Sequence, residues 1–544
     1  MKERLKITLS VKVGGVSHAI PGGNIRALEL EMTSYGVLGS ISFVVQDDQS
    51  YGGKYKDEVL ADFQKPDLGE VEVSVLPSHW DTSLAKTVKP VATKGIILEK
   101  RVIEHTYTRG FDGAVVLFRT YSVRFADAAR ALWTQHFPCN LLVAKAFKDA
   151  LEAYKGSAIT ATYSWDVITA QRPMIFFHLD PAYGASFYDL VIWFVRENNG
   201  VFSFDHANGK YSFADAKSAE GTAATLSRDE VASLMSDLPA VPRWQPRVLN
   251  SYAESPKTEV ITNAQAATSI TRDVLLRTPV AGEVDARTTL EKARPLLPKR
   301  EIELHFRCMP TVLVAPGSLL DISSKGGFSD ELIASSEPFR VYWLSFSASA
   351  LKGGPEIDYG DTAADFETSL VARLEQKSDK AVRLPVVAEP RFPGYLEGKV
   401  VSEQWEDTDI TYQVYQDENT SVDQYKVKIP LFDNQVITCP FDPHQGSGNF
   451  YIPAYRDARV LVEIYFDRAN VARLLDWRPG ARVPMDGQGE HLLLGVSDKS
   501  NTSILHDYED KKPVLQIKRT NEKDTAMVRI EEGKLTIQVK ENQG

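Results

Sequence analysis

Apolar and polar residues alternate along the last part of the chain, from Pro513 to Val539. A period of two is typical of β-strands, in which successive side chains point to opposite faces. The alternation predicts that Val514, Gln516 and Lys518 lie on one face and that an apolar stripe lies on the other. That stripe comprises Leu515, Ile517, Val528, Ile530, Leu535, Ile537 and Val539.

No later segment of this sequence could cover the stripe, and a lone β-hairpin is only marginally stable in water. Three copies around a common axis would bury the stripes against one another and leave the interspersed charges in solvent. These charges are Lys518, Arg529, Glu531, Lys534 and Lys540. We therefore expect an intertwined homotrimer that ends in a narrow β-spike. Two alternatives remain open, a frayed tail and an edge hairpin that packs on its own domain.

The first part of the chain also alternates, with Gly-rich turns at 21–23 and 51–53. Short β-branched runs predict strands at 4–13, 25–32, 39–46, 70–76, 95–106 and 114–125. They indicate a first β-barrel or sandwich over 1–126. From Asp127 apolar residues recur every three or four positions up to Leu151, which predicts helices. A further helix and a hairpin complete an insert over 127–240.

Alternation resumes after this insert and predicts a second barrel over 241–384. Its strands are expected at 247–253, 257–262, 299–307, 318–322 and 339–348, with a helical insert at 361–376. A linker rich in proline and small residues occupies 385–393. The next strands are expected at 395–402, 425–430, 435–439, 449–451, 460–466 and 492–496. Such closely spaced short strands favour an oligonucleotide/oligosaccharide-binding (OB) barrel over 394–510, followed by the β-spike over 511–544.

Composition excludes several classes of protein. The chain has 544 residues, 43% of them hydrophobic, and a net charge of −11. A nucleic-acid binder needs clustered basic residues, so this acidic balance argues against one. The distant Cys139, Cys308 and Cys439 lack metal-ligand spacing and indicate buried thiols in a reducing compartment. We expect neither a signal peptide nor a membrane span.

Two blocks of residues resemble a known family. The first reads SFYDLVIWFVRENNG at 186–200, VFSFDH at 201–206 and YSFAD at 211–215; the second reads GYLEGKVV at 394–401, YKVKIP at 425–430 and FYIPAYRDARVLVEIYF at 450–466. Their order and spacing are similar to those of the valine-glycine-repeat (VgrG) spike proteins of type VI secretion and of related phage baseplate hubs. Together they bracket most of the chain.

The resemblance implies a mainly β fold with inserted helices: two hub β-barrels, an OB barrel and a short trimeric β-helix or prism. The hub motif would comprise Phe187, Arg196, Glu197, Gly200, Phe204 and Asp215. This sequence departs from the family's pattern in three places. Residues 456–458 stand where the family has a Gly before its Val-Leu-Val strand, and the family's Trp-Val-Arg segment has no clear counterpart here. Residues 474–489 look like an insertion relative to the family. These departures suggest a distant, phage-like or extracellular branch.

The family's function would make this chain a homotrimeric spike and hub that adapts a hexameric tube to a membrane-puncturing tip. Two similar barrels per chain would give a trimer the pseudo-sixfold symmetry of the tube. The implied partners are other copies of the chain, an Hcp-like inner tube protein, a tip protein of the proline-alanine-alanine-arginine (PAAR) type, baseplate proteins, effector cargo and, transiently, a target membrane. Assembly would occur in the bacterial cytoplasm, and the particle would then be expelled.

The charged and histidine residues of the chain also have structural or enzymatic interpretations. Arg196 and Glu197 are neighbours on a helix and point to different faces, so capping or salt bridges between subunits are favoured over catalysis. His178 and His206 lack partners at metal spacing. An acidic run over 403–409 is read as a solvated loop. We expect no catalytic, metal or cofactor site.

The rival hypothesis is an envelope-degrading or glycan-binding protein that uses the OB barrel, although 474–510 is too short to hold a lysozyme domain.

Overall fold

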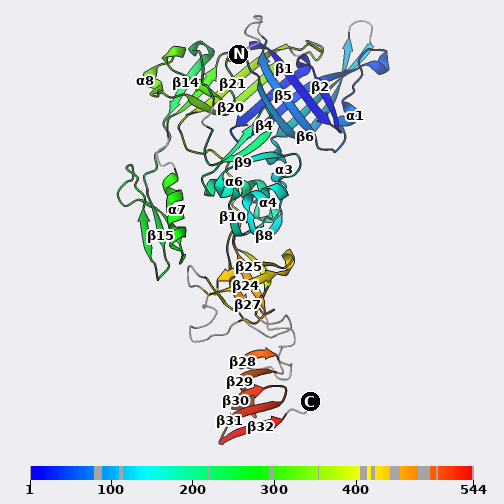
Figure 1. The fold of residues 1–544 in the computed structure, drawn as a ribbon. Helices are drawn as coiled ribbons and strands as arrows, with labels where there is room; N and C mark the ends of the chain where they lie inside the picture. Colours follow the sequence, from blue (N-terminus) through cyan, green and yellow to red (C-terminus); the bar gives the residue numbers. More distant parts are fainter. Residues whose placement is uncertain are drawn as a thin grey trace. The chain divides into compact units, whose positions relative to one another are not determined.

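The computed structural model describes residues 2–78, 88–109, 114–218, 221–294, 299–352, 354–404, 413–417, 423–440, 454–475, 490–497 and 500–541. The chain forms two compact units. The first comprises Met1–Phe137, Lys148–Ala170 and Leu179–Pro390, and the second comprises Pro138–Phe147, Gln171–His178 and Arg391–Gly544. Figure 1 shows the elements of both units, and strands dominate in each. The predicted class, mainly β with inserted helices, is confirmed.

One large sheet of 13 strands organises the first unit. The strands are β1 (Lys2–Val13), β2 (Val16–Ile20), β3 (Ile25–Thr33), β4 (Gly36–Asp47), β5 (Glu70–Pro77), β6 (Val91–Arg109), β7 (Ala114–Ala126), β13 (Ala224–Thr225), β14 (Val231–Asp237), β18 (Glu301–Phe306), β19 (Leu319–Asp321), β20 (Phe339–Ala350) and β21 (Ala364–Gln376). Period-two burial explains their formation: in β1, Leu5, Ile7 and Leu9 are at most 1% exposed, while Lys6 and Thr8 face solvent.

The pairings of this sheet join the two sequence segments in which separate barrels were predicted. Strand β20 pairs with β3, β21 pairs with β1, and β20 also pairs with β21. Together with the pairings β3–β4–β7–β6–β5–β1, these contacts close a ring of hydrogen-bonded strands. The first segment alone does not supply this ring within the described residues, because two of its strands come from beyond residue 338.

Two predicted helical stretches are wrong. Residues 364–376 form β21 rather than a helical insert, with Ala364, Phe366, Leu370 and Leu374 buried. The large apolar residues there are spaced by about four positions, which fits the 3.6-residue period of a helix as well as the two-residue period of a strand. Because small residues lie between them, the strand period is hard to recognise in the sequence. Residues 139–146 likewise form the strand β8 (Cys139–Ala146), which pairs with β10 (Gln171–His178).

The insert has an aromatic core. Its helices are α3 (Ala128–Trp133), α4 (Phe147–Tyr154), α5 (Asp166–Thr169) and α6 (Phe187–Glu197); its strands are β9 (Thr160–Ser164), β11 (Val201–Asp205) and β12 (Lys210–Ala214). Trp133 packs edge-on against Phe187 at 5.4 Å between ring centroids, and Phe202 stacks on Tyr211 at 5.4 Å. The predicted sequence of helix, turn and hairpin is present as α6, β11 and β12.

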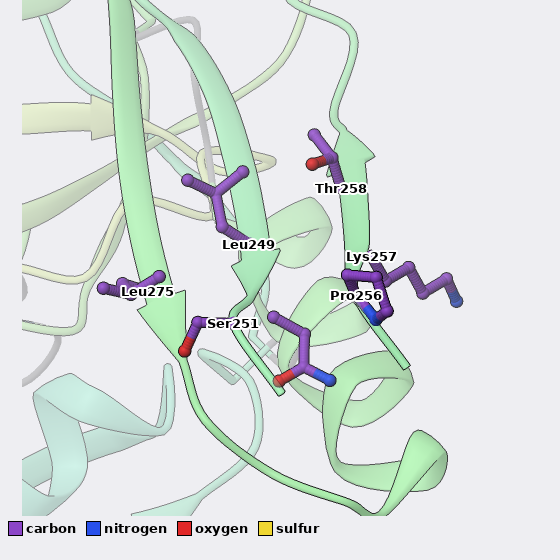
Figure 2. Close-up of a pocket in the computed structure, with 7 residues that line it drawn as sticks. Leu249, Ser251, Pro256, Lys257, Thr258 and Leu275 are labelled. Carbon is purple, nitrogen blue, oxygen red and sulfur yellow. The ribbon is translucent and has the colours of Figure 1, made fainter. Parts of the chain in front are cut away.

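Strands β15 (Gln245–Asn250), β16 (Lys257–Val260) and β17 (Thr271–Leu276) form a separate sheet, although two of them were predicted in the second barrel. Helix α7 (Ala281–Ala293) covers one face, where Val248, Ile261 and Val284 make a small core. Figure 2 shows Leu249 and Leu275 on adjacent strands near the end of this sheet. The short helices α1 (Leu60–Phe63) and α8 (Asp330–Ile333) complete the first unit.

The second unit contains a six-stranded sheet and the two-stranded antiparallel sheet β8–β10. The sheet consists of β22 (Gly394–Val400), β23 (Tyr415–Gln416), β24 (Asp423–Ile429), β25 (Gln435–Pro440), β26 (Arg459–Ile464) and β27 (Ala469–Leu474). Leu141 of β8 and Phe176 of β10 share a core with Tyr425 and Val460 of the six-stranded sheet. An added Cβ on Gly394 would lie 2.7 Å from the Phe176 ring, so glycine is required there. The strand pair β8–β10 thus belongs to this unit, and the OB topology stays a prediction.

The cysteines differ in their surroundings. Cys439 is fully buried in this core, Cys308 is intermediate, and Cys139 is exposed. The prediction of three buried thiols is therefore wrong for Cys139, which begins the strand β8. The predicted strand at 449–451, most of the acidic run at 403–409 and nearly all of the predicted insertion at 474–489 lie outside the described residues.

Candidate functional site

The chain ends in a sheet of five strands that pair in sequence order. These are β28 (Glu490–Ser497), β29 (Ser500–Glu509), β30 (Lys512–Thr520), β31 (Asp524–Glu531) and β32 (Lys534–Glu541). The sequence predicted a strand pair in this region and assigned residues 492–496 to the preceding barrel. The structure instead places that segment in β28, paired with β29. The sheet therefore begins earlier than the predicted spike.

An aliphatic row crosses all five strands. Leu492 lies opposite Ile504, Ile504 opposite Ile517, Ile517 opposite Val528 and Val528 opposite Ile537. Opposed residues of an antiparallel sheet share a face and contact one another. The five side chains therefore form one continuous row.

Two further rows flank it on the same face. One contains Leu515, Ile530 and Leu535. The other runs from Leu494 through Thr502, Arg519 and Ala526 to Val539, so it is apolar only in part. The seven side chains predicted from sequence as the spike interface thus share one face. We call this surface the tail face: Leu492, Leu494, Ile504, Leu515, Ile517, Val528, Ile530, Leu535, Ile537 and Val539.

The tail face is open to solvent in the single chain. The exposed fraction is 36% for Leu515, 63% for Leu535 and 74% for Ile537. Complete burial of an aliphatic side chain of this size contributes about 1.5–3 kcal/mol. A contiguous apolar surface of this kind marks an interaction site in a soluble protein.

The opposite face of the sheet is charged. Arg529 pairs with Glu509 and with Glu531 (3.1 Å), and Lys534 pairs with Glu531 (3.1 Å). Hydrogen bonds from Lys534 and then Arg529 lower the pKa of Glu531, so this carboxylate is ionised at neutral pH. Ion pairs therefore lie on this face, beside the buried Val514, whereas the tail face is mainly aliphatic.

The hub motif lies around α6. A capping box opens the helix: Ser186 Oγ accepts from the Asp189 amide, and Asp189 accepts from the Ser186 amide at 2.8 Å. Phe187 is fully buried and packs against Trp133 and His136, each at 5.4 Å between ring centroids. These contacts fix the start of the helix.

The charged pair at the end of α6 binds other segments of the first unit. Arg196 forms an ion pair with Glu389 at 2.8 Å, and Glu197 lies 3.9 Å from Arg294. Asn199 Nδ2 donates to the Leu290 carbonyl at 2.9 Å. The pair thus holds neighbouring parts of one chain together. Contacts between subunits stay a prediction.

The remaining motif residues shape the hairpin. An added Cβ on Gly200 would lie 2.3 Å from the Trp165 ring, which requires glycine. Phe204 is buried and lies 4.9 Å from the ring of His206, whereas Asp215 is exposed beyond the end of β12. His206 Nε2 donates to the Thr33 carbonyl at 2.8 Å, and its Nδ1 lies 3.2 Å from the Thr93 hydroxyl. Burial lowers the pKa of His206 to about 4.

Neither a metal centre nor a membrane helix emerges from the part of the chain that the structure describes. No group of three or more potential metal ligands gathers there, and no helix there is long and apolar enough to cross a membrane. A hollow of about 280 Å³ at the end of the β15–β17 sheet is lined by residues that include Leu249, Asn250 and Leu275 (Figure 2). Asn250 already bonds to Ser255 and Thr278, so this hollow offers little polar recognition.

Three residues of the tail face were missed from sequence: Leu492, Leu494 and Ile504. The alternation of apolar and polar residues around these three positions is visible in the sequence. Strands of the preceding sheet alternate in the same way, however, and only the pairing with β29 assigns β28 to the last sheet. The signal that could have found them is the even spacing of apolar residues across successive strands.

Comparisons with known proteins identify the fold. No protein-family model matches the sequence, and no curated protein matches it significantly. A chain in the lidless structure of a PdpA-VgrG complex has a TM-score of 0.72 and 15% identity, covering 99% of both chains. A chain in the half-lidded Francisella PdpA-VgrG complex has a TM-score of 0.72 and 14% identity, covering 98% of this chain and 88% of that one. The lidded form gives 0.71 and 14%, covering 99% and 80%. The resemblance to VgrG is thus confirmed for the fold.

Proposed function

We propose that this chain is the homotrimeric spike and central hub of a contractile injection machine, with the tail faces of three copies packed around one axis. The observation that carries the proposal is the aliphatic row from Leu492 to Ile537, which crosses all five strands and stays uncovered in the single chain. The likeness to chains of PdpA-VgrG complexes supports it.

Burial of the tail face would supply the association energy. Obligate interfaces exceed about 2,000 Å² and resemble a divided protein core. Two sheets stacked face to face would also cover an apolar face, so the sheet by itself does not fix the number of copies. Three copies are favoured because the VgrG resemblance implies a trimer and because a threefold arrangement can be closed by a single heterologous interface.

The partners follow from this role. We propose that the hub end binds an Hcp-like tube protein and baseplate proteins, and that the spike end binds a PAAR-type tip protein or effector cargo. The role is mechanical rather than enzymatic. The particle is assembled in the bacterial cytoplasm and expelled toward a target membrane.

Light scattering of the purified chain at several concentrations tests the proposal. A mass three times the 60.5 kDa of one chain is expected at all concentrations. A mass twice that of one chain would instead indicate a dimer in which two tail faces pack against each other. A stable monomer in dilute solution would contradict the proposal.

Incubation with peptidoglycan and other glycans separates this proposal from the rival envelope-degrading or glycan-binding protein. We expect neither turnover nor retention of glycan. Turnover by the intact trimer would add an enzymatic activity and would show that the mechanical role is incomplete.

A further inference from the structure

The ends of the strands in the terminal sheet carry charges, and the strand order gathers these ends on two borders. We call residues 519–524 and 540–541 border A, which holds the ends of β30 and β32 and the start of β31. Residues 509–512 and 531–534 are border B, which holds the starts of β30 and β32 and the ends of β29 and β31. In the proposed trimer, on which this inference rests, the sheets follow one another around the axis, so border A of each copy meets border B of the next.

Along border B the charge changes sign from each strand to the next. Strand β29 ends in Glu509, β30 begins with Lys512, β31 ends in Glu531, and β32 begins with Lys534. Neighbouring strands attract one another within the single chain: Lys534 pairs with Glu531 at 3.1 Å, and Lys512 pairs with Glu532. The alternation therefore stabilises the sheet of each copy.

Border A has the same signs on the same strands. Arg519 lies next to the last residue of β30, and Asp524 is the first residue of β31. The two side chains form an ion pair, and Arg519 is exposed. At the end of β32, Lys540 and Glu541 carry opposite charges and favour neither sign. Both borders are thus positive at β30 and negative at β31.

This shared pattern of signs is unfavourable for copies whose equivalent strands meet at the same level. Arg519 of one copy would then face Lys512 of the next, and Asp524 would face Glu531. Like charges brought together destabilise a contact, most strongly where apolar surface around them excludes water. The aliphatic row of the tail face does not select a level, because it continues across all five strands.

We propose that neighbouring copies meet with a stagger of one strand, so that the positive end of β30 in one copy lies beside a negative strand end in the next. Arg519 then faces Glu531 and Glu532 if the stagger runs toward the end of the chain, or Glu509 if it runs toward its start. In either direction the adjacent strand of the neighbour presents a lysine to Asp524. The tail face therefore fits a second copy in one alignment, which charge selects.

A tilt of the strands produces this stagger within a closed ring. A threefold rotation leaves all copies at the same height, so border A of each sheet must lie one strand spacing higher or lower than its border B. Strands β31 and β32 each have eight residues, which span about 27 Å, and neighbouring strands lie about 4.8 Å apart. A tilt of about 10° is enough, which is smaller than the tilt of strands in closed barrels.

Exchange of copies between trimers tests the alignment. The full-length chain is labelled at its N-terminus with a donor or an acceptor fluorophore, and energy transfer after mixing reports the exchange rate. Arg519→Glu places like charges together in the staggered contact and should speed exchange about tenfold. Glu532→Arg or Glu509→Arg, added to Arg519→Glu, should return the rate to within about threefold of the unchanged chain, and the change that does so identifies the direction of the stagger. These differences should shrink in about 1 M NaCl, because salt screens exposed charges.

Lys518→Glu is the matched control. Lys518 precedes Arg519 in β30, is exposed and points to the opposite face, so the same change of charge should alter the exchange rate less than about twofold. Hydrogen exchange of the β30 amides verifies that each variant forms the sheet. Unchanged or slower exchange in Arg519→Glu, or no recovery with either second change, would overturn the stagger while the trimer remains. A chain that forms no trimer would contradict the proposed function and the stagger together.

Discussion

The insert around α6 and the terminal sheet differ in how much of their apolar surface the single chain buries. In the insert, Trp133, Phe187 and Phe202 are at most 2% exposed, so one chain completes the core. In the terminal sheet, Leu535 and Ile537 are more than 60% exposed. The first region thus buries its large apolar side chains within one chain, whereas the second leaves its own exposed.

Association with other copies should therefore affect the terminal sheet more than the insert. Substitutions in the insert should change stability independently of protein concentration. Substitutions on the tail face should change the association state, because these side chains are largely exposed in the single chain and would be buried only by other copies.

The largest effect is expected from Ile537→Asp. In the proposed trimer this change places three unpaired charges near the axis, and burying an unpaired charge costs several kcal/mol. Light scattering should then show loss of the trimer or of spike order, while the first unit retains its fold. Binding of a tip protein should be lost with it.

The matched control is Gln538→Asp. Gln538 is the next residue of β32, it is exposed, and it points to the charged face. The same charge should have little effect there. Equal loss of trimer in both variants, or none in either, would show that the tail face does not lie at the interface.

The next largest effect is expected from Phe187→Ala. Phe187 is fully buried against Trp133 and His136, and removal of a buried phenylalanine costs about 3–5 kcal/mol. The first unit should unfold at lower denaturant concentration, and the shift should be the same at all protein concentrations. A shift that vanishes when the trimer is concentrated would mean that this core, too, depends on association.

The strands were largely predictable because period two is a local signal. The seven predicted interface residues lie on one face for the same reason. The joining of β20 and β21 to β3 and β1 could not be predicted, because no local pattern encodes a pairing across some 300 residues. The packing of β8 and β10 in the second unit could not be predicted either. The apolar residues of β8 fit a helix as well as a strand, and no local pattern shows that this strand pair packs against the six-stranded sheet.

The candidate sites differ in the same way. The tail face follows from alternation within neighbouring strands. The charged end of α6 does not: the pairs of Arg196 with Glu389 and of Glu197 with Arg294 join segments that only the tertiary fold brings together.

A pH effect of intermediate size is expected in the insert. The pKa of His206 is about 4 in the fold, against an ordinary value of 6.5. Above pH 6.5 both states carry a neutral imidazole. As the pH falls from 6.5 to 4, the unfolded chain binds a proton that the folded chain does not, so stability falls by about 3 kcal/mol.

Hydrogen exchange of the β11 and β12 amides at pH 7, 5 and 4 measures this loss region by region, which a single melting curve of a multidomain chain cannot do. His206→Gln should be less stable at pH 7, because it disturbs the contacts with Thr33 and Thr93, but its stability should depend less on pH. The terminal sheet should not follow the same profile. A parallel loss of protection in β30 to β32 would show that the two regions unfold together.

The smallest effect is expected from Arg196→Gln. Its ion pair with Glu389 is partly exposed, with 36% and 72% of the two side chains accessible, and such pairs contribute about 0–1 kcal/mol. If the pair acts only within the chain, as its geometry in the single chain indicates, Arg196→Gln and Glu389→Gln should each leave the trimer mass unchanged and should show little added effect when combined. A larger loss of association would instead place Arg196 at a contact between subunits, and the insert would then share the dependence on other copies that distinguishes the terminal sheet.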